Sequence, residues 1–520
     1  MASFKIKIIT LFICASYFST AQTITKPKVI KSEQYKSVRD WDPLKLEYTT
    51  IIGIANDSIG NSYLLKSDPR QKDKLGLLSI EIFDNNLKQL LSKNLEVPAD
   101  AGHFYNIENY YTLNNTPTLF YSQFQKDKSK KVFYFLQLDN KGNFSKKGKM
   151  VEVITKEENH GNFEIIQSKN RNTFMVVVYP PIKNKGNMTA SCFVFNDKIE
   201  KLKSFEVDFK NNPDNILKSE WTLSEEGIPF CLVGVKDPKL KKYQSSLFMY
   251  EDTNNPTQYD LNKKDNRVSD LMITLEDKDE ITFVGNYVGM DHDLSQGAVF
   301  LKIGKSDKKV KIVKTNQFSD EVLAYFKIKP IKPLTEKGIE YQSPYWAGST
   351  PSRNSFLVLG RFVNYFTSKS DYTNTGHSFV IMKFGPNGEL LFEKIQPYGN
   401  TAYIGNEGIR PNYFIMGEEL GVLHNNREKI VEKIKKGIPS EDKLGGSQVS
   451  HANSGLGKRG DINLYLQAFN SSGQSRFIQL TNHEVDQISV TNNPTWIRKD
   501  NSMVVGIIGL QSYGLMKLNF

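Results

Sequence analysis

Residues 378–396 read Ser-Phe-Val-Ile-Met-Lys-Phe-Gly-Pro-Asn-Gly-Glu-Leu-Leu-Phe-Glu-Lys-Ile-Gln, and this stretch decides the fold. It predicts two strands, at 379–384 and 389–395, joined by a turn at 385–388. Gly and Asn tolerate the positive φ that tight hairpin turns require. Both faces of the first strand are apolar, which is typical of a strand covered by other sheets on both sides.

The same strand–turn–strand unit recurs along nearly the whole chain. Similar turns stand at 84–86, 139–143, 196–198, 252–255, 305–307, 386–388 and 470–473. Asp84, Asp139, Asn196 and Asp252 are 55, 57 and 56 residues apart. An apolar strand, a polar turn and a further strand precede each unit, so each repeat holds four strands. Four strands in about 50 residues are the signature of a β-propeller blade.

The sequence therefore predicts an all-β fold, a single β-propeller of four-stranded blades. Eight units can be counted, and seven blades are the alternative if one unit is a cap. The eighth unit reaches Phe520 before a fourth strand. An open sheet edge is a pairing hazard, so we expect the strand-like segment 23–31 to complete the last blade.

Two motifs carry a family resemblance. Residues 57–63, Asp-Ser-Ile-Gly-Asn-Ser-Tyr, resemble the Asp-x-x-Gly-Asn-x-Tyr turn of secreted bacterial β-propeller repeat proteins. Residues 383–392 are similar to the hairpin of those proteins, with Phe392 where they have Trp. The resemblance implies a propeller fold and an envelope or extracellular location, but no particular activity.

The first 21 residues have the pattern of a signal peptide. Lys5 and Lys7 precede an apolar core at 8–18, and small residues follow at 19–21. No other segment approaches the roughly 20 apolar residues that span a bilayer. We therefore expect an exported protein, periplasmic, cell-surface or secreted, with the propeller at 22–520 and no transmembrane segment.

Motifs for a particular chemistry are scarce. The Gly-x-Gly-x-x-Gly match at 455–460 lacks the following helix that a dinucleotide needs, and Gly-x-Ser-x-Gly is absent. Cys192 and Cys231 lie in apolar strand contexts and are interpreted as buried free thiols. Asp291 and Asp293 flank a histidine and are weak candidates for Ca²⁺; the plainer interpretation is a solvated turn. No other cofactor is expected.

The longest insertions fall in blades five to seven, on the face that carries the connections between second and third strands. The insertion at about 425–460 contains a predicted helix at 427–436, with Asn425 or Asn426 as N-cap. These connections are rich in lysine, which favours either an anionic partner or simply solubility. The candidate binding residues are Lys239, Lys241, Lys242, Tyr365, Tyr372, His377, Lys429, Lys433, Lys435 and Lys436.

These observations predict a binding module for a protein or an anionic polysaccharide of the cell envelope. The alternative is a carbohydrate-active hydrolase or lyase with carboxylates over the central channel, since sequence cannot pair distant carboxylates. The enzyme question stays open, with the non-enzymatic interpretation preferred. The formal net charge of +11 does not indicate a nucleic-acid partner, because no base-stacking motif interleaves with the lysines.

Overall fold

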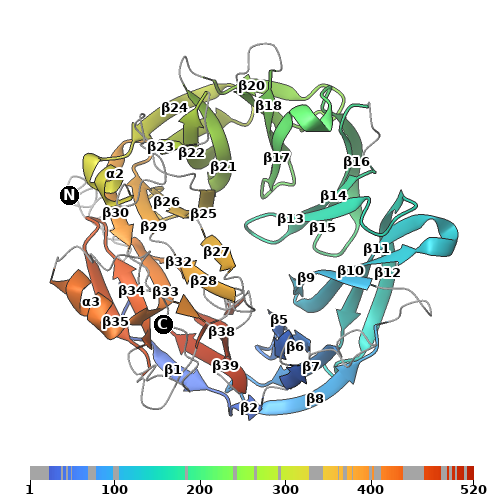
Figure 1. The fold of residues 1–520 in the computed structure, drawn as a ribbon, viewed down its shortest axis with the longest axis vertical. Coiled ribbons are helices and arrows are strands. Elements are labelled where there is room, and N and C mark those ends of the chain that lie inside the picture. Colours follow the sequence, from blue (N-terminus) through green and yellow to red (C-terminus); the bar gives the residue numbers. More distant parts are fainter. Residues whose placement is uncertain are drawn as a thin grey trace, which may run out of the picture.

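The repeats form antiparallel sheets that stand in a ring as the eight blades of a β-propeller in the computed structural model (Figure 1). The prediction of eight blades is confirmed, and the alternative of seven is wrong. The structure describes residues 23–520 apart from 37–38, 43–44, 49, 68–77, 98–104, 182–185, 238–242, 263–265, 291–293, 327–342, 361, 367–371, 377–378, 397–400, 403–410, 437–461, 482–488, 491–494, 498–500 and 509–511. The signal peptide expected at 1–21 lies outside these residues.

In blades one to four the strands follow the chain from the ring's centre outward in each sheet. Blade one is β5 (Thr50–Asn56), β6 (Ser62–Ser67), β7 (Leu78–Phe83) and β8 (Gln89–Leu95). Blade two is β9 (Tyr105–Leu113), β10 (Thr116–Gln125), β11 (Lys130–Leu138) and β12 (Phe144–Ile154). Blade three is β13 (Asn162–Gln167), β14 (Thr173–Tyr179), β15 (Thr189–Asn196) and β16 (Lys201–Asp208). Blade four is β17 (Ile216–Leu223), β18 (Pro229–Lys236), β19 (Tyr243–Met249) and β20 (Thr257–Asp260).

Blades five to seven keep this order with insertions. Blade five is β21 (Asn266–Glu276), β22 (Glu280–Gly289), β23 (Ser295–Gly304) and β24 (Val310–Gln317). Blade six is β25 (Ser343–Ser349), β26 (Ser355–Gly360), β29 (Phe379–Phe384) and β30 (Leu390–Gln396). Blade seven is β32 (Asn412–Met416), β33 (Glu419–Arg427), β34 (Ile462–Phe469) and β35 (Ser475–Gln479). A small separate sheet is formed by β27 (Phe362–Phe366), β28 (Tyr372–Gly376) and β31 (Thr401–Ala402).

Blade eight combines strands from both ends of the chain. Its C-terminal part is β36 (Ser489–Val490), β37 (Thr495–Ile497), β38 (Ser502–Ile508) and β39 (Ser512–Asn519). The outer strand is β1 (Lys28–Lys31), which pairs with β39, followed by the short β2 (Tyr35–Lys36) on the same strand. The prediction that the N-terminal segment completes the last blade is confirmed. A two-stranded hairpin of β3 (Arg39–Asp42) and β4 (Lys45–Tyr48) precedes blade one.

The hairpin at 378–396 shows why these sequences form blades. All six residues of β29 are buried, and alternate side chains face opposite neighbours. Val380 and Met382 pack toward blade five with Phe300, whereas Phe379 and Ile381 pack toward blade seven. A strand between two sheets must be apolar on both faces, as the sequence predicted.

Four turns between third and fourth strands and the first turn of blade one share one geometry. At residues 57, 84, 139, 196 and 470, an Asp or Asn side chain accepts hydrogen bonds from the backbone N–H groups two and four residues later. Such side-chain caps fix a tight turn without help from distant residues. The repeated Asp/Asn in the sequence is therefore a local signal for blade edges; Asp57 uses it at the first turn of blade one.

Two helices lie outside the blades. In α3 (Glu428–Lys435) Val431 is fully buried, as expected for a stripe packed on the propeller. The predicted N-cap was wrong, because Asn425 and Asn426 belong to β33, which pairs with β34 up to Arg427. The second helix, α2 (Asp320–Phe326), was not predicted. In the described part of the chain, no helix has the length and apolar content needed to cross a bilayer.

Candidate functional site

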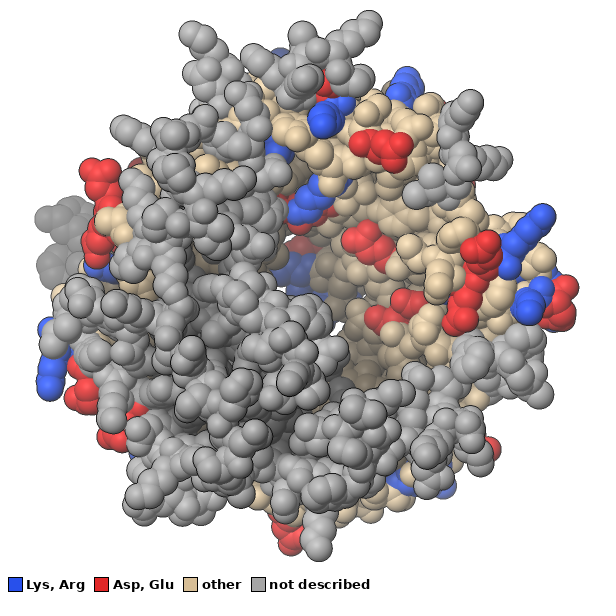
Figure 2. All heavy atoms as spheres, in the orientation of Figure 1, with Lys and Arg blue, Asp and Glu red and all other residues tan. Residues whose placement is uncertain are grey.

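The innermost strands of the blades surround a central channel. In chain order these include β5, β9, β13, β17, β21, β25 and β32. Figure 2 shows the hollow in the middle of one face, with acidic side chains on the wall to its right. The channel is the feature that collects polar side chains from several blades, so we describe it first.

Four neighbouring blades each place a carboxylate on their innermost strand. Glu108, Glu164, Glu220 and Asp270 lie on β9, β13, β17 and β21, each within the first five residues of its strand. The first three are 56 residues apart, and Asp270 follows after 50. Because inner strands all start from the same face, the series lies along one side of the channel. We call these four residues the acid series.

Glu164 is held by a hydrogen-bond chain that crosses a blade boundary. The Trp221 indole Nε1 donates to the Tyr179 hydroxyl at 2.9 Å, and that hydroxyl lies 3.1 Å from the Glu164 carboxylate, to which it donates. Glu164 is exposed, yet the channel walls exclude much of the surrounding water, and this burial raises the pKa of the Glu164 carboxyl. The carboxylate is thus fixed in position and open to a ligand.

Glu108 occupies the corresponding place in blade two. The Ser122 hydroxyl donates to its carboxylate. Burial raises the pKa of Glu108, and the Ser122 hydrogen bond and the charge of Lys131 act in the opposite direction. The Lys131 ammonium is itself buried and lies 3.4 Å from the Gly161 carbonyl oxygen of the next blade. Lys131 therefore links blade two to blade three.

Glu220 and Asp270 share one lysine between blades four and five. The Lys218 ammonium contacts the Asp270 carboxylate and lies 3.4 Å from that of Glu220. Asp270 is 1% exposed, whereas the Glu220 side chain keeps 29% of its surface open. Burial, and next the charge of Asp270, raise the pKa of Glu220 to about 7. Lys218 carries one positive charge and faces two carboxylates, so one negative charge remains uncompensated. Glu220 can remove that charge by binding a proton.

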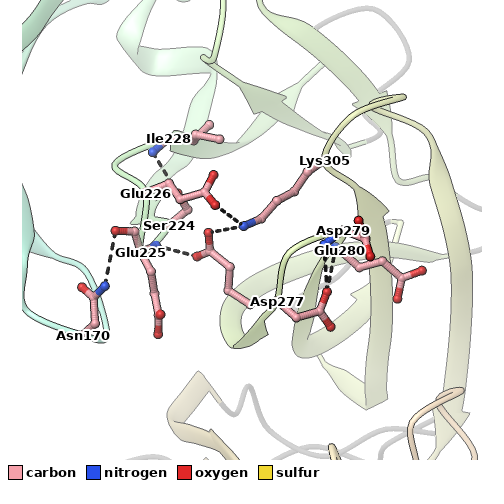
Figure 3. A network of polar contacts seen from close by, with 10 residues as sticks. Asn170, Ser224, Glu225, Glu226, Ile228, Asp277, Asp279, Glu280 and Lys305 are labelled. Carbon is pink, nitrogen blue, oxygen red and sulfur yellow. Dashed lines mark hydrogen bonds and ion pairs between the residues drawn. The ribbon is translucent and has the colours of Figure 1, made fainter.

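The turns at the other end of the channel are tied together by a second network (Figure 3). The Lys305 ammonium lies 2.8 Å from Glu226 and 2.8 Å from the buried carboxylate of Glu276. The backbone N–H of Glu225 donates to Glu276 at 2.5 Å, and the Asn170 amide donates to the Glu225 carbonyl at 3.4 Å. These contacts join blades three, four and five. Among the residues that the structure describes, no three His, Cys, Asp or Glu side chains are grouped to hold a metal.

Most residues predicted as a binding site fall outside the described residues or lack described side chains. Lys239, Lys241, Lys242, His377, Asp291 and Asp293 lie outside. The backbones of Lys429 and Lys433 are in α3, and those of Tyr365 and Tyr372 are in the paired strands β27 and β28. Lys436 is exposed, and Lys435 is exposed with its ammonium 2.9 Å from Glu432. The binding role of all these residues stays a prediction.

Some lysines of the connections between second and third strands already have partners within the protein. Lys130 lies 2.8 Å from Glu152, and Lys131 is buried where it links blade two to blade three. Lys126 and Lys128 are exposed on a short 3₁₀ turn. The interpretation of the two cysteines is confirmed, since Cys192 and Cys231 are free and buried, and burial raises the pKa of both thiols.

The acid series was not predicted, because the repeats are most evident in the sequence at their turns and not at these inner-strand positions. A signal was present: Glu108, Glu164 and Glu220 recur at the repeat length itself. Equivalent positions of successive blades face the same axis. A carboxylate that recurs once per blade therefore lies at the same height along the channel in each blade.

Comparisons with known proteins give structural neighbours but no family. No protein-family model matches the chain, and no curated protein matches it in sequence. Among solved structures, the β-propeller domain of the Trilobed protease from Pyrococcus furiosus is 10% identical with a TM-score of 0.37, over 84% of this chain and 96% of that one. Pyrococcus horikoshii acylaminoacyl peptidase is 11% identical with a TM-score of 0.38, over 91% of this chain and 60% of its own.

A third similar structure is prolyl oligopeptidase B from Galerina marginata, 9% identical with a TM-score of 0.40. The match covers 89% of this chain and 55% of that chain. This chain thus spans only part of the length of the two peptidases.

Proposed function

We propose that the protein is a binding module whose channel receives a cationic group, an ammonium or guanidinium, from a partner molecule. The observation that carries this proposal is the acid series on the inner strands of blades two to five. Glu164 is exposed within the channel while Tyr179 and Trp221 hold it in place. A prearranged carboxylate binds a cation without first having to be ordered.

The electrostatics of the series support the same proposal. Burial raises the pKa of Glu108, Glu164 and Glu220, so each ionised carboxylate is less stable here than in water. Strongly perturbed carboxyl pKa values cluster at functional sites, where burial and neighbouring charges tune groups for their task. A bound cation would remove this penalty for the carboxylate it contacts.

The cellular location that we propose for this function is based on the sequence. The expected signal peptide and the resemblance to secreted propeller repeat proteins favour a role in the cell envelope or outside the cell. The lysine-rich connections favoured an anionic partner, but Lys130 and Lys131 are engaged internally. More of the described side chains support a binding site in the channel than one on the lysine-rich connections. The partner that we propose is therefore a basic protein segment.

Titration calorimetry with hexalysine, and with hexaglutamate as the oppositely charged probe, tests the proposal. We expect hexalysine alone to bind and Glu164→Gln to weaken its binding at least ~5-fold, since a charge-assisted contact contributes about 1–3 kcal/mol. Glu206→Gln is the matched control, because Glu206 is exposed on the outer strand β16, where Ser191 donates to it at 2.7 Å. Equal affinities of the two variants for hexalysine would overturn the proposal.

A carbohydrate-active hydrolase or lyase is a second candidate, favoured by one observation. Glu220, with its pKa raised to about 7, lies beside Asp270, and a carboxyl that keeps its proton near neutral pH suits a general acid. Release of reducing ends from a panel of polysaccharides would detect such activity. Glu220→Gln should abolish it and Glu206→Gln should leave it unchanged; activity that survives Glu220→Gln excludes this mechanism.

A further inference from the structure

A lysine from blade three reaches two blades across the channel. Lys169 lies in the turn between β13 and β14, whose hairpin tip points toward the middle of the ring (Figure 1). Its ammonium donates to the Thr274 carbonyl oxygen of β21 and lies 3.3 Å from the hydroxyl oxygen of Ser349, the last residue of β25. Blades three, five and six therefore meet at one amine.

The surroundings of this amine favour its neutral form. Burial lowers the pKa of Lys169, and the charge of Glu225 acts in the opposite direction. Several charged groups at this end form pairs with one another: Glu276 and Glu226 with Lys305, and Asp277 with Arg353. Within the described part of the chain, the hydrogen-bond partners of Lys169 are two uncharged oxygens.

Ser349 completes the arrangement. It is half-buried at the end of β25, an innermost strand of the ring. The hydrogen bond to Thr274 holds the Lys169 amine in place. When the amine is neutral, its lone pair can accept a hydrogen bond from another group. We propose that Ser349 is a nucleophile and that Lys169 is its general base, a serine–lysine pair formed across the channel. Serine–lysine pairs are an established alternative to the serine–histidine pair in acyl transfer.

The chemistry is an ordinary acyl transfer to water. The Ser349 oxygen attacks the carbonyl carbon of an ester while its proton passes to the Lys169 nitrogen. The tetrahedral intermediate collapses, the ester C–O bond breaks, and the alcohol leaves with the proton from Lys169. Water then attacks the acyl-serine, with Lys169 again accepting and returning a proton. The products are one carboxylic acid and one alcohol from one ester and one water.

The substrate class follows from the charges nearby. Glu225, Glu226, Glu276 and Asp277, from the turns of blades four and five, outnumber their partners Lys305 and Arg353, so an anionic ester would be repelled. The ester is therefore uncharged or cationic. This inference is independent of the cation-binding role proposed for the acid series, which lies on other residues.

A fluorophosphonate probe, which phosphonylates activated serines, tests the pair directly. Peptide mass spectrometry of the labelled protein identifies the modified residue. We expect the label on Ser349, and we expect Lys169→Arg to slow labelling at least ~10-fold, since a general base contributes about 10²–10⁴-fold. Arginine keeps the charge, the reach and the donors of lysine, but it cannot act as a base at neutral pH.

Ser352→Ala is the matched control for Ser349→Ala. Ser352 is an exposed serine in the next turn, where its backbone N–H donates to Glu418 at 2.9 Å. Ser349→Ala should abolish the label and Ser352→Ala should leave it unchanged. Two results overturn the proposal: no label on Ser349, or labelling of Ser349 at the same rate in Lys169→Arg. In either case hexalysine binding is unaffected, so the result leaves the proposed binding function standing.

Discussion

Val29 of β1 lies opposite Leu518 of β39, so residues from the two ends of the chain are neighbours in one ladder. The N-terminal segment also contacts blade seven. Ile24 is 1% exposed, its backbone N–H donates to Glu419 at 2.7 Å, and Arg476 binds both that carboxylate and the Ile24 carbonyl. The N-terminal segment thus fastens blade seven as well as blade eight, and it covers the outer edge of β39.

Deletion of residues 22–32 should therefore destabilise the whole ring. Full burial of one aliphatic side chain contributes about 1.5–3 kcal/mol, and the deletion removes Ile24, Val29 and Ile30 from the core. We expect a fall in Tm of at least about 5 °C by calorimetry. Lys28→Ala, an exposed change in the same strand, should leave Tm unaltered. An unchanged Tm after the deletion would mean that β1 does not close the ring.

The seam between blades one and eight contains a buried ion pair. The Lys66 ammonium lies 3.3 Å from Glu81 and 2.8 Å from the Tyr513 hydroxyl, which donates to Glu81 at 2.5 Å. Removing one member of such a pair leaves a buried charge, so Lys66→Met should lower the free energy of unfolding by about 3–5 kcal/mol in urea titrations.

The double variant Lys66→Met/Glu81→Leu is the informative comparison for this seam. It leaves no uncompensated charge, so its loss should be smaller than the sum of the two single losses. Lys88→Ala, at an exposed lysine in the turn before β8, should change stability by less than about 0.5 kcal/mol. Additive losses in the cycle would show that Lys66 and Glu81 act independently.

The architecture was predictable because its signals are local. The apolar strand at 379–384, the Asp or Asn that caps a turn, and the repeat length can each be recognised within a single blade. Even the donor strand followed from a local deficit, a last unit one strand short. The start of α3 was not predictable in this way, because pairing of β33 with β34, more than 30 residues on, extends the strand through Asn425 and Asn426.

The contacts across the channel form only when the ring closes, so they could not be predicted from local sequence patterns. Lys169 and Ser349 are 180 residues apart and meet only because blades three and six face one axis. Trp221 and Glu164 are joined through Tyr179 by the order of neighbouring blades. The one available signal was the recurrence of glutamate at the blade period, and it indicates a common level in the ring rather than a ligand.

The turn of the hairpin at 378–396 offers a test of the local signals. Gly388 has φ of +78°, and a Cβ there would lie 2.6 Å from Cδ1 of Phe300 in blade five. Gly388→Ala should therefore cost at least about 2 kcal/mol, since the left-handed conformation alone costs an L-residue roughly 1–2 kcal/mol. Asn387→Ala, at the exposed neighbouring position, should cost less than half as much in the same urea titration. Equal losses would mean that the turn readily rearranges.

The last prediction concerns the pH dependence of stability at Glu220. Burial and the charge of Asp270 raise its pKa from an ordinary 4.5 to about 7, so between these values the folded protein binds a proton that the unfolded chain does not. Stability from this group is therefore greatest below about pH 4.5 and is lost as pH rises through 7. Above that pH the ionised carboxylate opposes folding by up to about 3 kcal/mol.

Glu220→Gln removes this penalty while keeping size and shape. The variant should be more stable than the wild type by about 1–3 kcal/mol at pH 8, and the difference should shrink toward zero at pH 5. Glu206→Gln, at the exposed control site on β16, should follow the wild type at both pH values. Urea titrations at pH 5 and pH 8 measure all three proteins. If Glu220→Gln is no more stable than the wild type at pH 8, the raised pKa of Glu220 is wrong, and with it the general-acid role.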